Sequence, residues 1–582
     1  MPALSIYLRA HVKNGAAIVR DTQHIRKILR QASAELAALL VPVAASFIEL
    51  AHIATTGWRA VYLYAGDSLT LPIIRQSLDR KEAIQWVFSS QLNLFPEGIL
   101  YAIASIFTRS ISTSLAINSV INIALFYIVI RLIMSVSTTI TRMRQRLYSI
   151  ACTLIVIGYM LLETYGSRIN QTQATYFLFN TYYDGLVIIG LFVLYILLRQ
   201  IRSRQSLWSK TNIALTLFAL LLPALTIASD PLYAMQFTAP CVVVLAIFYC
   251  CRYASRRRLL FLAVVQALAF DIGMSGRFFL RSFIGEALQG HEIETSLGVF
   301  DHILAPFSTI APLNPSITLY MRILINIVIY FLIVFYVLIQ MNRKLKDKHA
   351  KLQPLSLFVL CFIAVEPLVL GVLLTAMNGL QDRYLITPIL LPPIGLVLIV
   401  AAIESRRVQW WIERSILLVA ALAVLLGLVA LTRTKPLIAA GYNGSTCLAA
   451  ALDYHAANGV SDYDTARALD VYGVDGIRVL QTEGVKPYAW LNNLASYENK
   501  QFSFAVVTKD GGFHYFDNLG KPSSVQSCPT FWVYQYAPGS AGYRTLNQGM
   551  DASLQQQLLS RKQGKIADYL MAQLEQQESA KK

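Results

Sequence analysis

The chain has 582 residues, of which 55% are hydrophobic and only 14% are charged. A soluble protein of this length carries far more charge, so the composition excludes an ordinary soluble enzyme. The formal net charge of +17 would suit a nucleic-acid-binding protein, but the distribution of the basic residues along the chain argues against that class.

Apolar stretches of about 20 residues recur as far as residue 432, and each is long enough to cross a bilayer as an α-helix. They predict a polytopic α-helical membrane protein with about eleven transmembrane helices. The approximate bounds of these spans are 34–54, 111–133, 147–164, 184–199, 211–228, 233–251, 257–274, 318–340, 354–376, 385–403 and 413–432.

Basic residues gather in alternate connections between these spans. They are dense in the N-terminal segment 1–33 and near residues 142–146, 199–210, 252–258, 343–351 and 406–414. This positive-inside pattern places the N-terminus in the cytoplasm, and an odd number of spans then places the region after residue 432 outside. No cleavable signal peptide is evident, because the segment before the first span is polar and basic. We therefore expect a multi-pass protein of a bacterial inner (plasma) membrane, with membrane lipids and not nucleic acid as partners.

Residues 34–432 are expected to form the membrane domain, with a long first outer loop at 55–110 and a second long outer loop at 275–317. A short apolar piece at 99–107 within the first loop is expected to lie at the membrane interface. Residues 433–550 predict a small α+β extracytoplasmic domain, with strands at 502–507 and 531–536. Residues 551–582 are typical of a solvated helical tail.

Two cysteines, Cys447 and Cys528, lie in the expected outer domain. An oxidising compartment would permit a disulfide bond between them, although their spacing alone does not establish it.

Acidic residues in the outer connections are the first candidates for chemistry. Asp67 follows Gly66 in the first loop, Glu97 follows Pro96 later in that loop, and Asp230 lies in a short outer connection. A carboxylate at the membrane surface can act as a general base or hold a divalent cation. The alternatives are that these are solvated loop acids and that Glu97 caps a short helix. Asp184 is expected simply to face water.

Residues that could bind a phosphate lie on the same predicted face. An arginine can clamp a phosphate or pyrophosphate group, and the candidates for substrate binding are Arg383, Tyr384, Tyr233, Arg277 and Arg281. For Arg277 and Arg281, four residues apart, anchoring of a lipid headgroup is an equal alternative.

His291, Glu292 and Glu294 lack fixed ligand spacing, so no metal site is assigned. Within a span, Glu366 is either functional or hydrogen-bonded at a proline kink.

Two short motifs carry a resemblance to a known family. The run Gly66-Asp67-Ser68-Leu69, followed by Phe95-Pro96-Glu97-Gly98, resembles the first periplasmic loop of GT-C type membrane glycosyltransferases. The segment Asp382-Arg383-Tyr384-Leu385 is similar to one that opens a late helix in many of them. The family includes protein mannosyltransferases, aminoarabinose transferases and the catalytic subunits of oligosaccharyltransferases.

The resemblance implies a GT-C-like fold and a catalytic role for the first-loop acid, here Asp67. Two departures from the family pattern are that Ser68 replaces the second acid of a frequent pair, and that Phe95 precedes Pro96 where a Pro-Pro pair is usual. The expected function is transfer of a sugar from a polyprenyl-phosphate carrier to a glycan, lipid or protein acceptor on the outer face. The alternatives are a transporter or flippase of lipid-linked saccharides and a non-catalytic envelope assembly protein.

Overall fold

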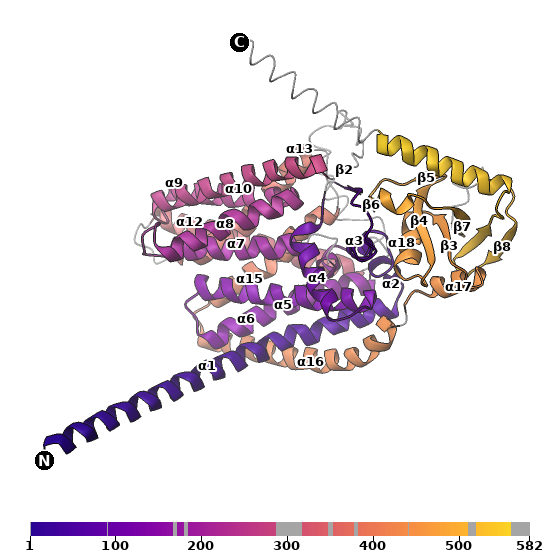
Figure 1. Ribbon diagram of the computed structural model, residues 1–582. Helices are drawn as coiled ribbons and strands as arrows, with labels where there is room; N and C mark the ends of the chain where they lie inside the picture. Colours follow the sequence, from indigo (N-terminus) through magenta and orange to yellow (C-terminus); the bar gives the residue numbers. More distant parts are fainter. Residues whose placement is uncertain are drawn as a thin grey trace, which may run out of the picture.

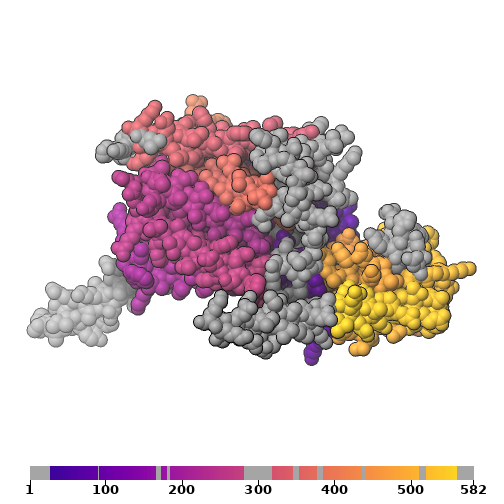
Figure 2. All heavy atoms as spheres, turned by 90° about the horizontal axis from the view of Figure 1, so that it is seen from above, coloured from indigo at the N-terminus to yellow at the C-terminus, as the bar shows by residue number. Residues whose placement is uncertain are grey.

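A computed structural model describes residues 2–559, apart from 90, 167–171, 180–183, 284, 287–316, 347–352, 377–381, 440 and 510–518. Two structural parts are apparent in it (Figure 1): a large helical part and a smaller C-terminal part built on a sheet. Seen from above in Figure 2, the orange and yellow C-terminal part lies at one side of the helical part.

Long apolar helices make up the first part. Within the described residues, ten helices are long and apolar enough to cross a membrane, and helices suit that environment because they satisfy their own backbone hydrogen bonds. The long helices are α1 (Pro2–Thr55), α5 (Ile111–Ser137), α6 (Arg142–Gly166), α7 (Asp184–Arg202), α8 (Lys210–Ser229), α9 (Ala239–Cys251), which follows the π-helix η4 (Ala234–Thr238), α10 (Arg256–Phe283), α12 (Ile317–Lys346), α13 (Pro354–Ala376) and α16 (Arg406–Ala439).

The stretch expected to span at 385–403 forms a shorter apolar helix, Ile386–Ala401. It consists of α14 (Ile386–Leu390) and α15 (Pro392–Ala401), which follow the 3-10 helix η5 (Asp382–Leu385). The break falls at Pro392, because proline lacks an N–H and clashes with the preceding turn. Among the described residues, the eleven expected spans therefore correspond to ten long apolar helices and one shorter helix.

The first loop contains short elements that lie at one end of the helical part (Figure 1). They are α2 (Trp58–Tyr62), η1 (Asp67–Leu69), α3 (Thr70–Asp79), β1 (Trp86–Phe88), η2 (Leu94–Gly98) and α4 (Ile99–Ile106). The apolar piece expected at 99–107 is α4, which packs on α5. A further 3-10 helix, η3 (Thr175–Leu178), precedes α7.

The C-terminal part contains a six-stranded mixed sheet with the strand order β5-β4-β3-β7-β9-β8. Its strands are β3 (Ala457–Ser461), β4 (Ile477–Glu483), β5 (Lys486–Pro487), β7 (Phe502–Thr508), β8 (Ser524–Ser527) and β9 (Phe531–Gln535); its helical elements are α17 (Asn443–Ala451), α18 (Tyr463–Val471), η6 (Leu494–Tyr497) and a helix at 541–559. β3 pairs in parallel with β4 and β7, and α18 makes the crossover between β3 and β4.

Both faces of this sheet are covered, because apolar side chains on β7 point alternately to two cores. Phe504 and Val506 pack into one core, whereas Ala505 and Val507 pack into the other. Cys447 of α17 is bonded to Cys528, which follows β8, so the disulfide permitted by the sequence is present.

A small second sheet joins the two parts. β1 of the first loop pairs antiparallel with β6 (Asn492–Asn493) and parallel with β2 (Gly285–Glu286), which follows α10. The C-terminal domain is thereby bonded directly to the loop that carries the candidate acids.

Candidate active site

Asp67 lies at the junction between the first loop and the C-terminal domain. It is the first residue of η1, and its side chain is half-buried. Its Oδ1 accepts a hydrogen bond of 2.8 Å from the hydroxyl of Tyr463, the first residue of α18. The carboxylate expected to act at the membrane rim is therefore oriented by a side chain from the other end of the chain.

Arg467 supports this arrangement from one turn further along α18. Its guanidinium is almost fully buried and donates to the Tyr463 hydroxyl at 2.8 Å and to the Gly66 carbonyl at 2.6 Å. The same nitrogen donates to Thr70 Oγ1 at 3.0 Å. Arg467 also lies over the Tyr463 ring, with 4.5 Å between guanidinium carbon and ring centroid. These contacts fix Tyr463 relative to the Asp67 loop and put a positive charge behind it.

Gly66 permits the close approach of α18. Its N–H donates to Asp464 Oδ1 at 2.6 Å, and a Cβ added at Gly66 would lie 2.3 Å from Tyr463 Cε1. Burial, followed by the nearby charges of Asp462 and Asp67, raises the pKa of Asp464, while the Gly66 N–H partly offsets the rise. A residue larger than glycine has no room at this position.

A second group of acids lies where the first loop meets the helix ends. Glu97 is buried, and it accepts a hydrogen bond from the backbone N–H of Leu186 in the first turn of α7. Burial raises its pKa well above the usual value, and the charges of Asp184 and Asp230 raise it further. The sequence offered Glu97 as a cap for the short helix after Pro96. In the structure its carboxyl lies instead at the N-terminal end of α7, where the helix dipole favours a negative charge.

The loop that carries Glu97 is held in place by α8. The Oγ of Ser229 accepts hydrogen bonds from the N–H groups of Leu94 at 3.0 Å and Phe95 at 3.1 Å. The Phe95–Pro96 peptide bond is cis, and the Pro96 ring packs against Gly185, where an added Cβ would lie 2.5 Å from Pro96 Cγ. The loop and the start of α7 therefore touch without intervening space.

Asp230 and Asp184 complete this second group, hereafter the acid cluster of Glu97, Asp184 and Asp230. Asp230 is buried at the C-terminal end of α8 and accepts a hydrogen bond of 2.9 Å from the Leu232 N–H. Asp184 is fully buried as the first residue of α7. The expectation that Asp184 faces water is therefore wrong, because the first loop covers the helix end on which it lies.

The residues predicted to bind a phosphate are distributed around these helix ends. Tyr233 is buried just before η4, and Arg277 is buried on α10. Tyr384 is half-buried in η5, and its carbonyl accepts from Gln236 Nε2 at 2.8 Å. The side chains of Arg281 and Arg383 lie outside the described residues, as do His291, Glu292 and Glu294.

The predicted acids thus fall into two groups. Glu97 and Asp230 lie together with Asp184, whereas Asp67 lies with Tyr463 and Arg467. Within a span, Glu366 is buried and accepts a hydrogen bond of 2.5 Å from Thr387. Among the described residues, no group of three His, Cys, Asp or Glu side chains is arranged to hold a metal ion.

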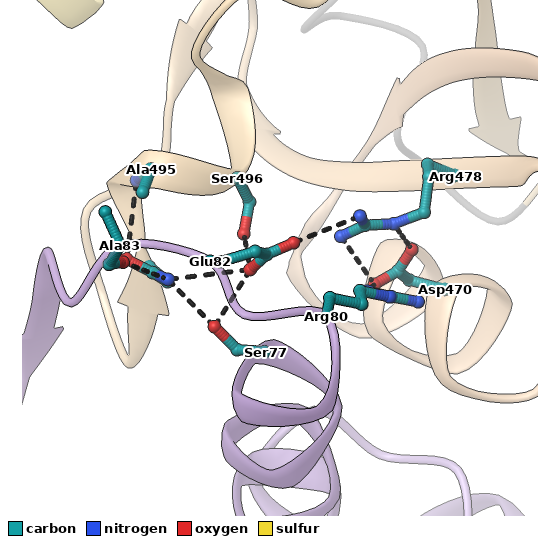
Figure 3. A network of polar contacts seen from close by, with 9 residues as sticks. Ser77, Arg80, Glu82, Ala83, Asp470, Arg478, Ala495 and Ser496 are labelled. Carbon is teal, nitrogen blue, oxygen red and sulfur yellow. Dashed lines mark hydrogen bonds and ion pairs between the residues drawn. The ribbon is translucent and has the colours of Figure 1, made fainter.

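A polar network fastens the first loop to the C-terminal domain (Figure 3). Arg478 of β4 lies between two carboxylates: its Nη1 is 3.2 Å from Glu82 and its Nε is 2.5 Å from Asp470. Glu82 also accepts hydrogen bonds from Ser77 at 2.8 Å and from Ser496 at 2.7 Å. These ion pairs and hydrogen bonds join the first loop to the C-terminal domain in one defined orientation, because each carboxylate has partners in a fixed geometry.

Tyr463, Arg467 and Asp184 are the site residues that the sequence alone did not indicate. An acid that opens an apolar span is a signal for Asp184, since such residues are costly to bury. No comparable signal connects Tyr463 with Asp67.

No protein-family model matches the chain, and no curated protein matches its sequence.

Proposed function

We propose that this protein is a membrane glycosyltransferase of the GT-C type, which moves a sugar from a polyprenyl-phosphate carrier to an acceptor outside a bacterial inner membrane. The observation that carries the proposal is the hydrogen bond from Tyr463 to the half-buried carboxylate of Asp67, beside a loop bonded to the C-terminal domain. A base for group transfer needs such an arrangement, with a fixed orientation and access to water on one side.

In the proposed step, Asp67 is the general base. It takes the proton from the acceptor hydroxyl or amine as the acceptor atom forms a bond to the anomeric carbon of the sugar. The bond from that carbon to the carrier phosphate breaks, and the polyprenyl phosphate leaves with the electron pair. The O–H of Tyr463, itself held by Arg467, fixes the orientation of the Asp67 carboxylate before the step.

The acid cluster has a different role in this proposal. Glu97 is buried and its pKa is raised, so it is the member best suited to stay protonated and donate a hydrogen bond. A neutral carboxyl at the helix ends could hold a sugar hydroxyl or a phosphate oxygen of the donor. Asp230 is proposed as a second carboxylate of the same donor site.

Arginines are proposed to balance the negative charge that develops on the leaving phosphate. Arg383 and Arg277 are the leading candidates, with Arg281, Tyr384 and Tyr233 as further substrate contacts, and a divalent cation carried with the phosphate would serve the same purpose. The C-terminal domain, which touches the Asp67 loop directly, is proposed to bind the acceptor.

The test is complementation of a deletion strain with the full-length protein. Asp67→Asn is compared with Asp79→Asn, which changes an exposed acid in the same loop. Mass analysis of envelope glycans and glycoproteins should show a missing modification in the Asp67→Asn strain and a restored one in the control strain. A fully active Asp67→Asn protein at normal abundance would overturn the assignment of the base.

Detergent-solubilised protein separates transfer from transport. With no sealed membrane present, a transferase still releases the polyprenyl phosphate from its sugar, whereas a flippase cannot produce that change. Failure of the wild-type protein to consume any carrier-linked sugar that accumulates in the deletion strain would contradict the proposed reaction.

A further inference from the structure

We propose that a basic pocket at the end of the helices away from Asp67 binds the phosphate headgroup of an anionic lipid. The pocket has a volume of about 470 Å³ and lies between the end of α5, the end of α7 and the start of α8. Its charged lining consists of Arg199, Arg202 and Arg204. This site is independent of the proposed glycosyl transfer.

The position of the pocket follows from the helices that form it. α8 begins beside it at Lys210 and ends at Ser229, next to the acid cluster. A helix of 20 residues is about 30 Å long, which is the thickness of the hydrocarbon core of a bilayer. The pocket and the acid cluster therefore lie at opposite ends of the membrane-crossing part.

The arginines of the pocket have donors available for a ligand. Arg202 donates to the Val136 carbonyl at 3.2 Å, at the C-terminal end of α5. By contrast, the guanidinium groups of Arg199 and Arg204 make no hydrogen bond or ion pair with any residue that the structure describes. Among the described residues, no acidic side chain lines the pocket, so none of them neutralises these charges.

Two neighbouring groups add to the positive potential. Arg258 donates to the Gln200 carbonyl at 2.9 Å and to the Gln205 carbonyl at 2.7 Å, which places a fourth guanidinium beside the pocket. The first turn of α8 supplies Thr211 and Asn212 to the lining. The N-terminal end of a long helix carries a partial positive charge and favours anions, which adds to the charge of the arginines.

The surface that leads away from the pocket indicates a lipid and not a free phosphate. Along α8, Leu215 lines the pocket, and Phe218, Leu221 and Leu225 continue from it with 53%, 51% and 52% of their side chains exposed. Trp208, 76% exposed in the preceding connection, is of a type that gathers where headgroups meet acyl chains. A headgroup in the pocket would thus have its chains along the apolar surface of α8.

The size and charge of the pocket fit a phosphodiester headgroup such as that of phosphatidylglycerol. Guanidinium groups match phosphate oxygens in pairs, and the ligand brings the negative charge that the wall lacks. A zwitterionic headgroup also brings a cation, which three arginines would repel. We therefore expect discrimination between anionic and zwitterionic lipids of equal chain length.

The test is lipid binding by the full-length protein in detergent, measured by native mass spectrometry. The probes are dioleoyl phosphatidylglycerol and dioleoyl phosphatidylcholine. The variant Arg199→Gln with Arg204→Gln leaves Arg202 and its contact with α5 intact. The matched control is Arg256→Gln with Arg257→Gln, which removes the same charge from exposed positions on α10 outside the pocket.

We expect the Arg199/Arg204 variant to lose about 30-fold in affinity for phosphatidylglycerol, and the control to lose less than about 3-fold. Equal losses in both variants would show general surface attraction and overturn the site. An unchanged affinity in the Arg199/Arg204 variant would do the same. Glycerol 3-phosphate at millimolar concentration serves as the free phosphate, and complete displacement of the lipid by it would overturn the lipid assignment.

Discussion

Tyr463 donates a hydrogen bond of 2.8 Å to Asp67, which lies 396 residues earlier in the chain. The direction of this bond is fixed by its neighbour. Arg467 can only donate, and it donates to the Tyr463 oxygen, so the single phenolic proton is directed toward the carboxylate. The C-terminal domain thereby contributes directly to the electrostatics of the first loop.

Replacing Tyr463 with phenylalanine tests this contribution. The change removes the donor to Asp67 and the acceptor for Arg467 while keeping the ring in place. A hydrogen bond to a charged group contributes about 1.5–3 kcal/mol, so we expect the rate of sugar transfer to fall by roughly 10- to 100-fold. The measurement is the single-turnover rate with saturating carrier-linked sugar.

Tyr454→Phe is the control, because Tyr454 is exposed in the same domain. Its rate should match that of the wild-type protein. Wild-type rates for Tyr463→Phe, in a protein that folds normally, would show that the hydrogen bond only supports the docking of the domains.

Gly66 offers a structural test of the same junction. In Gly66→Ala the new methyl group would lie 2.3 Å from Tyr463 Cε1, so the side chain of Tyr463 must move from its place beside the loop. Overpacking of this kind costs about 1–3 kcal/mol. We expect a lower thermal unfolding midpoint and faster proteolysis between the two domains. Gly57→Ala, where nothing lies within 4 Å of the added Cβ, should leave both measurements unchanged.

Much of the fold could be predicted because its signals are local. All eleven apolar stretches are helical in the structure, including 385–403, although the proline at residue 392 divides that one. The strands expected at 502–507 and 531–536 are β7 and β9, since alternating apolar residues indicate two covered faces. β3 was not expected, because Asn458 and Gly459 interrupt its apolar pattern.

The site could be predicted only in part, because its contacts are not local. Asp67, Glu97 and Asp230 were expected at one end of the helices, and the structure places them in or beside the first loop. Their grouping depends on tertiary packing: Ser229 binds the Glu97 loop, and α18 binds the Asp67 loop. One sequence contains no signal for such pairings.

The network of Glu82, Asp470 and Arg478 should dominate the docking of the C-terminal domain. Arg478 is largely buried, and both its acidic partners are too. Removing Arg478 takes away the ion pair of Glu82, while Asp470 keeps its ion pair with Arg80 at 3.2 Å. Removal of one partner of a buried pair costs about 3–5 kcal/mol in comparable cases. We expect Arg478→Met to lower the free energy of unfolding strongly and Glu82→Gln to do so less, because Asp470 still pairs with the arginine.

A double-mutant cycle checks whether these residues act together. Combining Arg478→Met with Glu82→Gln should cost less than the sum of the two single changes, since the second change removes a charge that the first left unpaired. The exposed ion pair of Arg75 and Asp79 is the control, and its members should show almost no coupling. Strict additivity for Glu82 and Arg478 would contradict their pairing.

Glu97 should make stability depend on pH. An unfolded chain loses the Glu97 proton near the usual pKa of 4.5, whereas burial and the nearby acids keep it bound to higher pH in the folded protein. Above pH 4.5 the folded state therefore holds more protons, and the free energy of unfolding falls as pH rises, by up to about 1.4 kcal/mol per pH unit. The fall ends above the folded-state pKa of Glu97.

The glutamine variant Glu97→Gln cannot ionise, so its unfolding midpoint between pH 5 and pH 8 should decline less steeply than that of the wild-type protein. Glu483, exposed on β4, provides the control: Glu483→Gln should keep the wild-type slope. Parallel slopes for wild-type and Glu97→Gln proteins would show that Glu97 is already ionised in the folded state.

The Cys447–Cys528 bond should stabilise the C-terminal domain by restricting its unfolded state. The two cysteines are separated by 81 residues, and closing a loop of that size corresponds to roughly 4.5 kcal/mol in the chain-entropy treatment. Replacing both cysteines with serine should therefore lower the denaturant concentration at which the sheet domain unfolds. The effect should equal that of reducing the wild-type protein, because both remove the same constraint.

Cys250→Ser, at an exposed free cysteine of α9, is the control and should leave the denaturant midpoint of the sheet domain unchanged. Equal midpoints for the wild-type protein and the double serine variant would show that the native contacts of the sheet, and not the bond, determine the stability of this domain.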